Sequence, residues 1–149
     1  MESKNAVLAI LGAIGSSIAY ILGGWDTALQ TLLLFMGVDI VTGYLVGGVF
    51  HKSEKTEGGR LESRAGFKGL CRKGVILLIV LVAAQLDALM QTDIVRNAVI
   101  IAFIANELLS IIENVGLMGV KIPTALQNAI EVLQKNGDDS NENSTISRS

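Results

Sequence analysis

Four long apolar runs constrain this chain more than any other feature of its sequence. They cover residues 5–24, 28–50, 74–90 and 94–112. A helix rises about 1.5 Å per residue, so about 20 apolar residues cross the ~30 Å hydrocarbon core of a bilayer. The third run is slightly short, which a thinner bilayer or snorkelling flanks can accommodate. The sequence therefore predicts an all-α integral membrane protein with about four transmembrane helices.

Two of the runs have an alternative interpretation. The first could be a cleaved signal peptide, but Glu2 nearly cancels the charge of Lys4, and the run is longer than a usual signal-peptide core. We therefore expect it to be retained. The fourth could instead be an amphipathic helix on the membrane surface, because it contains Arg96, Asn97, Asn106 and Glu107.

Composition supports a membrane protein and argues against several other classes. Half of the residues are hydrophobic and 17% are charged, whereas soluble domains carry about 25% charged residues. The single Cys71 and single His51 exclude a disulfide framework and a His-rich metal site. A net charge of −2 without a basic, aromatic-rich patch gives no reason to expect nucleic acid. We find no nucleophile–base pair, so we expect no enzyme, and the single Cys and His give no reason to expect a metal.

The links between the runs predict the topology. Residues 51–73 contain seven Lys or Arg against three Glu, so the positive-inside rule places this loop in the cytoplasm. The links at 25–27 and 91–93 contain no Lys or Arg and fit the outside. Trp25 suits an interfacial position, and Thr92 or Asp93 could cap the fourth helix. Both termini are then expected in the cytoplasm.

The chain changes character after its fourth apolar run. We expect a transmembrane domain over residues 1–114, and a connector with an amphipathic helix over 115–135. Pro123 suits the first turn of that helix, and its apolar face recurs at i, i+4 and i+7 in Leu126, Ile130 and Leu133. Residues 136–149 are polar and are expected to be a disordered tail.

Small or polar residues recur every four positions in each run, so they share one helix face. The stripes are Gly15, Ala19, Gly23 in the first run; Asp39, Gly43, Gly47 in the second; Ala83, Asp87, Gln91 in the third; and Ala98, Ala102, Asn106, Ser110, Asn114 in the fourth. Small residues let helices approach closely in lipid, and polar ones hydrogen-bond across the contact. Such stripes can mediate oligomerisation, although ordinary packing within one bundle explains them equally well.

Asp39 is harder to explain by packing alone. It lies near the middle of its run, where a charged carboxylate costs at least about 3 kcal/mol. Intramembrane carboxylates usually face a bundle interior or water and mark a functional site. The alternative is a neutral structural carboxyl that is hydrogen-bonded to another helix. We expect Asp39 to be protonated or hydrogen-bonded in the resting protein.

The other polar residues separate into two groups by their depth. Asp87 lies near the outer end of its run and is expected to snorkel to the interface, whereas Glu107 lies in the inner part of the fourth run. The candidate intramembrane polar and oligomerisation residues are Asp39, Gly43, Gly47, Asp87, Asn106, Glu107 and Ser110. Those expected at the cytoplasmic interface are Arg72, Lys73, Glu113 and Asn114.

Four motifs, in this order and at these spacings, resemble the toxin-secretion/phage-lysis holin family over nearly the whole chain. They are DIVTG from Asp39, SRAGFKGLCRK from Ser63, LD at Leu86, and NELLSIIENVGLMGVKIP from Asn106. The last motif is the most specific, DIVTG alone would be weak, and the first apolar run matches no motif. The match includes Asp39 and Gly43 in the second run, and Asn106, Glu107, Ser110, Glu113 and Asn114 in the last.

The resemblance implies a function that composition cannot give. Family members accumulate in the bacterial cytoplasmic membrane, form homo-oligomers and open lesions that release a phage endolysin or, in some relatives, export a toxin. They need no cofactor. Two alternatives stay open: a small ion channel or transporter subunit, and an antiholin-type regulator. A second Met near the start would hint at a regulator made from a second start site, but the next is Met36.

Overall fold

The structure is a computed structural model that describes residues 2–50 and 63–132. The helices of these residues are α1 (Glu2–Ile21), α2 (Thr27–Leu45), the π-helical turn η1 (Val46–Phe50), α3 (Ser63–Met90) and α4 (Ile94–Leu117). A short unlabelled helix covers residues 124–132. The predicted all-α fold is confirmed, and the described part of the chain contains no strand.

The prediction of about four membrane-spanning helices is also confirmed by length and composition. The segments long and apolar enough to cross a bilayer are Ser3–Ile21, Thr27–Phe50, Arg64–Met90 and Ile94–Leu117. The second segment joins α2 to η1 without a break.

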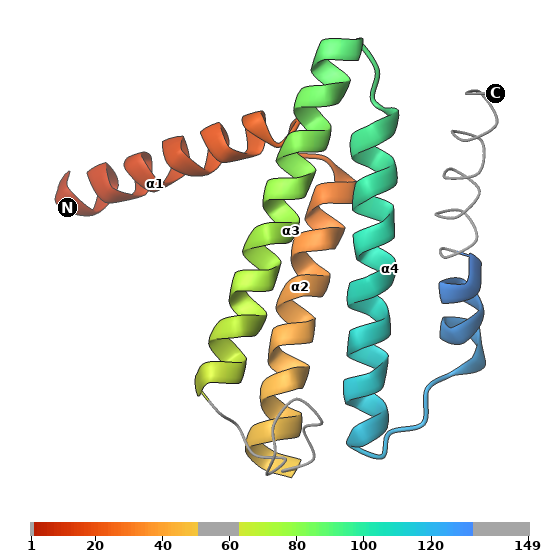
Figure 1. The fold of residues 1–149 in the computed structure, drawn as a ribbon. Helices are drawn as coiled ribbons and strands as arrows, with labels where there is room; N and C mark the ends of the chain where they lie inside the picture. Colours follow the sequence, from red (N-terminus) through yellow and green to blue (C-terminus); the bar gives the residue numbers. More distant parts are fainter. Residues whose placement is uncertain (1, 51–62, 133–149) are drawn as a thin grey trace, which may run out of the picture.

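Helices α2, α3 and α4 run alongside one another as a bundle (Figure 1). Helix α4 packs against both α2 and α3, and α2 also contacts α3. The dry core of this bundle consists of apolar side chains from all three helices: Leu29, Leu32 and Met36 of α2, Ile76 and Val80 of α3, and Ile100 and Ile104 of α4. Their spacings of three, four and seven residues give each helix one buried face.

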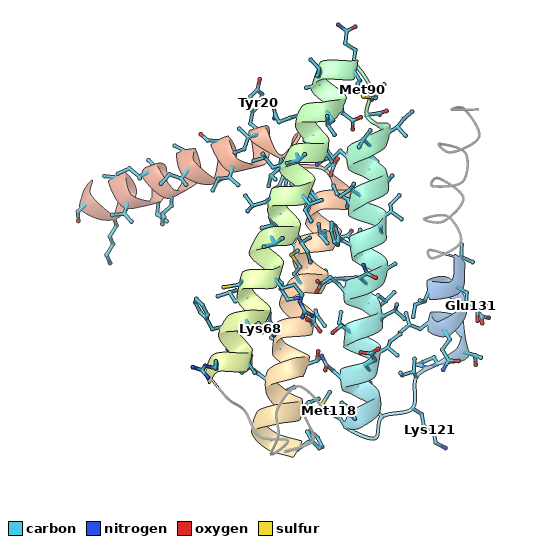
Figure 2. All side chains as sticks on the ribbon, in the orientation of Figure 1. Tyr20, Lys68, Met90, Met118, Lys121 and Glu131 are labelled. Atoms are coloured by element: carbon cyan, nitrogen blue, oxygen red, sulfur yellow. The ribbon has the colours of Figure 1, made fainter. Side chains whose placement is uncertain are left out.

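Helix α1 leaves the bundle sideways near the start of α2 (Figure 1). The turn uses Gly23 and Gly24 at φ +89° and +106°, a left-handed conformation that glycine adopts without steric cost. The side-chain amide of Gln85 donates to the carbonyl of Ile21 at 3.3 Å, which ties the end of α1 to α3. The rest of α1 is uncovered, and Tyr20 is 82% exposed (Figure 2).

Several boundaries differ from those expected. Helix α3 begins at Ser63 rather than at residue 74, so half of the expected loop 51–73 is helical. Helix α4 continues to Leu117, and the carboxyl-terminal helix begins at residue 124, one residue after Pro123; residues 133–135 of the expected helix lie outside the described residues. The rest of the predicted basic loop, 51–62, and the predicted disordered tail, 136–149, lie outside the described residues.

Candidate functional site

A buried network of charged and polar groups joins the three bundle helices. The ammonium group of Lys73 on α3 donates to Oδ2 of Asp39 on α2 at 2.8 Å. It also donates to Oε2 of Glu107 on α4. All three side chains are nearly inaccessible, with 10%, 12% and 7% of their surfaces exposed. One cation therefore bridges two carboxylates from the two flanking helices.

The side-chain amide of Asn114 extends this network toward the C-terminal end of α4. The Nδ2 of Asn114 donates to Oδ1 of Asp39 at 3.1 Å and to Oγ1 of Thr42 at 3.0 Å. The hydroxyl of Thr42 donates in turn to the backbone carbonyl of Asp39 at 3.1 Å. Every buried side-chain polar atom in the described residues has a hydrogen-bond partner. The network is satisfied by protein groups, as a polar cluster inside a bundle must be to avoid a large desolvation cost.

Seven-residue spacing places these side chains on the buried face of each helix. On α3, Lys73 precedes the core residue Val80 by seven positions, and Asp87 follows Val80 by seven. On α4, Glu107 follows the core residue Ile100 by seven positions, and Asn114 follows seven later. Residues seven apart lie nearly in line along a helix because 3.6 residues make one turn. The network thus continues the apolar core as a polar layer.

The network lies well inside the spans. Asp39 follows Thr27, the start of α2, by twelve residues, which is about 18 Å along the helix. Glu107 follows Ile94, the start of α4, by thirteen residues, or about 20 Å. With a hydrocarbon core of about 30 Å, both carboxylates belong to the half of the span nearer the C-terminal ends of α2 and α4. Breaking such a buried pair by removing one partner costs about 3–5 kcal/mol.

A second polar cluster closes the opposite end of the bundle. Asp87 on α3 accepts the backbone N–H groups of Val95 at 3.1 Å and Arg96 at 2.7 Å, and also the hydroxyl of Thr92. It therefore caps the first turn of α4 from a neighbouring helix. The expectation that Asp87 snorkels outward is wrong: it is buried at 4% exposure. Asp93 occupies the N-cap position without a side-chain cap bond.

Arg96 joins the start of α4 to the segment that connects α1 and α2. Its Nε donates to the carbonyl of Leu22, its Nη2 to the carbonyl of Gly24 at 3.1 Å, and its Nη1 to Oδ2 of Asp26 at 2.6 Å. Asp26 also caps α2 by accepting the N–H of Leu29 at 2.9 Å. The hydrogen bonds from Arg96 lower the pKa of Asp26 from 3.8, an effect that partial burial opposes and the N–H of Leu29 reinforces.

The remaining predicted site residues lie in different surroundings. A Cβ at Gly43 would lie 3.8 Å from Nδ2 of Asn114, so this glycine faces the network. Gly47 is buried within η1, Ser110 is half-buried, and Asn106 is exposed. The four-residue stripe of α4 is therefore exposed at Ala102 and Asn106, and Glu107 faces inward instead.

Two residues expected at the cytoplasmic interface lie elsewhere. Lys73 and Asn114 are buried at 8% and 5% exposure within the network, whereas Arg72 and Glu113 are exposed. The expectation treated Lys73 as the last residue of a loop, but α3 begins ten residues earlier and turns its side chain inward. Extending the stripe of Asp87 backwards in steps of seven, rather than four, would have placed Lys73 on the buried face.

Sequence reasoning gave no specific role to three contributing residues: Thr42, Asp26 and Arg96. Arg96 in particular counted only as a reason to doubt the fourth span, yet it is a buried, fully paired group. No group of three or more His, Cys, Asp or Glu in the described residues is arranged to hold a metal ion. The arrangement instead suits a conformational role, because it holds helices together through charges that water would readily solvate.

The chain is similar in sequence to a known protein family and to several bacterial proteins. A family model described as "Bacteriophage holin family" matches residues 16–135. An uncharacterized protein of Listeria innocua is 37% identical over 134 residues, which cover 89% of each chain. An uncharacterized 14.9 kDa protein in the nagH 3' region of Clostridium perfringens is 37% identical, covering 81% of this chain and 87% of the relative.

A phage protein is also similar to this chain. The "Probable holin" of Bacillus phage phi105 is 32% identical over 115 residues, which cover 76% of this chain and 79% of the relative. No solved structure matches. The family match spans the whole polar network and omits most of α1, the helix that lies outside the bundle. The chain is a membrane protein that belongs to the bacteriophage holin family.

Proposed function

We propose that this chain oligomerises in the bacterial cytoplasmic membrane and permeabilises it, so that an endolysin reaches the cell wall. Family membership and the phage relative support this function. The observation that carries the proposal is the buried network of Asp39, Lys73 and Glu107 inside otherwise apolar helices. Packing does not require charges there, and intramembrane charges mark a functional site by default.

The network gives the bundle two possible arrangements. In the bundle, Lys73 neutralises part of the charge of two carboxylates, and the polar groups satisfy one another. When all three groups are ionised, the triad holds one positive and two negative charges, so one negative charge remains uncompensated within it. At high protein density the same faces can line a hydrated assembly, where water solvates the charges and the desolvation cost disappears.

The uncovered apolar surface of the monomer is compatible with association in the membrane. Helix α1 has no part of its span buried against the bundle, and only 22–33% of the other three spans is buried. Lipid or other copies of the chain must cover these surfaces. Interfaces between such helices depend on close packing and on cross-helix hydrogen bonds rather than on a hydrophobic driving force.

The test is inducible expression of the chain in a bacterium that also produces a cytoplasmic endolysin without an export signal. The proposal predicts abrupt lysis and release of the folded endolysin after a delay, with neither event when the chain is omitted. Ion leakage without endolysin passage would indicate a channel, and no loss of viability would indicate a regulator. A parallel strain that produces a large toxin in place of the endolysin tests the other cargo. Release of the toxin alone would keep the permeabilising function and change only the exported protein.

A further inference from the structure

The first turns of α3 extend beyond the hydrocarbon core. Helix α3 has 28 residues, from Ser63 to Met90, and is therefore about 42 Å long. About 20 residues cross the hydrocarbon core, which leaves about eight at the level of the lipid headgroups. Arg72 follows within one turn of these residues, and its long side chain can snorkel to the same level. Lys68 and Met90 lie toward opposite ends of this helix (Figure 2). Because residues 76–90 are almost wholly apolar, the extra length belongs to the end at Ser63.

Three basic side chains share the outward side of this end. Arg64, Lys68 and Arg72 are spaced four residues apart and are all exposed. Successive residues turn by about 100° around a helix, so Arg64 lies about 180° from Lys73, which points into the bundle. Lys68 and Arg72 are turned about 140° and 100° from Lys73. The three charges therefore form a stripe directed away from the protein.

Apolar side chains border this stripe on one side. Phe67 is 70% exposed and Leu70 is 59% exposed. The bundle-facing side is fixed by Tyr44 of α2, whose hydroxyl lies 2.9 Å from the position of a Cβ at Gly66. A cationic sector beside an aromatic and aliphatic sector is the pattern of segments that lie at the boundary between headgroups and acyl chains.

The three charges have no partner within the described part of the chain. The described ion pairs involve only Lys73 and Arg96 among the basic residues. Residues 63–74 contain no Asp or Glu that could compensate them. The backbone N–H groups at the start of α3 add a partial positive charge at the same end. This combination attracts phosphate groups that lie in the headgroup layer.

We propose that Arg64, Lys68 and Arg72 bind the phosphate groups of anionic phospholipids in the leaflet at the Ser63 end of α3. This leaflet is the cytoplasmic one in the topology that the sequence predicts, with the bacterial cytoplasmic membrane of the proposed function as the location. A basic side chain near an anionic membrane surface contributes enough binding free energy for about a fivefold preference. Binding would also fix the depth of α3, and with it the depth of Lys73.

The test uses full-length protein, labelled with a fluorophore at its single Cys71, which is exposed beside the stripe. It is reconstituted in phosphatidylcholine vesicles that contain headgroup spin-labelled phosphatidylglycerol or, in parallel, spin-labelled phosphatidylcholine. We expect at least about fivefold stronger quenching by phosphatidylglycerol, with the preference reduced in 1 M salt because the Debye length falls to about 3 Å. Added inorganic phosphate should not compete.

Two variants separate charge from structure. The triple neutral variant R64Q/K68Q/R72Q should quench equally with both lipids, whereas the charge-preserving exchange R64K/K68R/R72K should keep the preference. Lys121→Gln, on the connector after α4, should leave it unchanged. Equal quenching by the two lipids in the unmodified protein, or an unchanged preference in the neutral variant, would overturn the proposal. The assay needs no lesion, so its failure is independent of failure to permeabilise.

Discussion

Lys73 lies between Asp39 and Glu107, donates to Asp39 at 2.8 Å and is separated from each of them by 34 residues in the sequence. One side chain thereby connects α3 to α2 and to α4 at the same level of the bundle. The pairing explains how two carboxylates persist in apolar helices. It also makes the three-helix contact dependent on charge, and a charge-dependent contact can exchange its protein partners for water.

Lys73→Met should destabilise the bundle by about 3–5 kcal/mol, because it leaves Asp39 and Glu107 buried without their cation. The measurement is the free energy of unfolding of detergent-solubilised protein in a denaturing-detergent titration. Lys121→Met is the matched control, since Lys121 is exposed outside the bundle, and it should change stability little. Equal effects of the two substitutions would show that the bridge contributes nothing specific.

Gly43→Leu should push Asn114 away from Asp39 and Thr42, because even a Cβ at Gly43 would lie 3.8 Å from the Asn114 amide. We expect a loss of about 1–3 kcal/mol in stability, typical of overpacking, together with delayed killing. Gly37→Leu is the control on the same helix, since a Cβ there meets no atom within 4 Å. If both variants unfold and kill like the unmodified chain, Gly43 is not a packing position.

The ion pair of Asp26 and Arg96 should make the stability of the fold depend on pH in the acid range. The lowered pKa of Asp26 means that its ionised form favours the folded state, so its contribution is present above about pH 3.8 and is lost as the pH falls through the lower folded-state pKa. Asp26→Asn should therefore lower the melting temperature at pH 7, and the difference from the unmodified protein should shrink below pH 3.8. A difference that is constant from pH 7 to pH 3 would contradict this assignment.

Asp39→Asn should delay or abolish lysis without preventing membrane insertion. The amide keeps hydrogen-bonding capacity but leaves Lys73 opposite a single carboxylate, Glu107, so the cluster loses its uncompensated negative charge. Lysis timing at matched membrane expression, with and without an uncoupler, is the measurement. Asp39→Leu should also weaken association, because it removes the contact with Asn114. Lysis by Asp39→Asn on the unmodified schedule would reduce Asp39 to a structural residue.

The sequence predicted the number and type of the helices well, because unbroken apolar runs report directly on membrane-spanning length. It also listed Asp39 and Glu107 among the candidate intramembrane polar residues, and in the structure Lys73 pairs with both. It missed the role of Lys73, because a basic residue at the edge of an apolar run looks like part of a loop. Only the start of α3 at Ser63 shows that this side chain is inside a helix.

Contacts between distant segments were beyond sequence reasoning for a different reason. Asp87 was expected to snorkel because it lies near the outer end of its run. Its partners in the structure, the N–H groups of Val95 and Arg96, are available as donors because α4 starts there, after a tight turn. Likewise, Arg96 was judged as an isolated charge, although Asp26 and the carbonyl of Leu22 surround it once α1 and α2 meet at their glycine turn. Spacing on one helix carries no information about such partners.

Cysteine accessibility measures directly whether the polar network exchanges its protein partners for water when the lesion opens. Both variants are made in a Cys71→Ser background. Thr42→Cys places a thiol in the network, because Thr42 is buried. Val41→Cys places a thiol at the same depth on the lipid-facing side, because Val41 is 58% exposed. We expect an impermeant maleimide to label position 42 only after the lesion opens, and to label position 41 at neither time. Lesion opening without labelling at position 42, or with equal labelling at both positions, would contradict it.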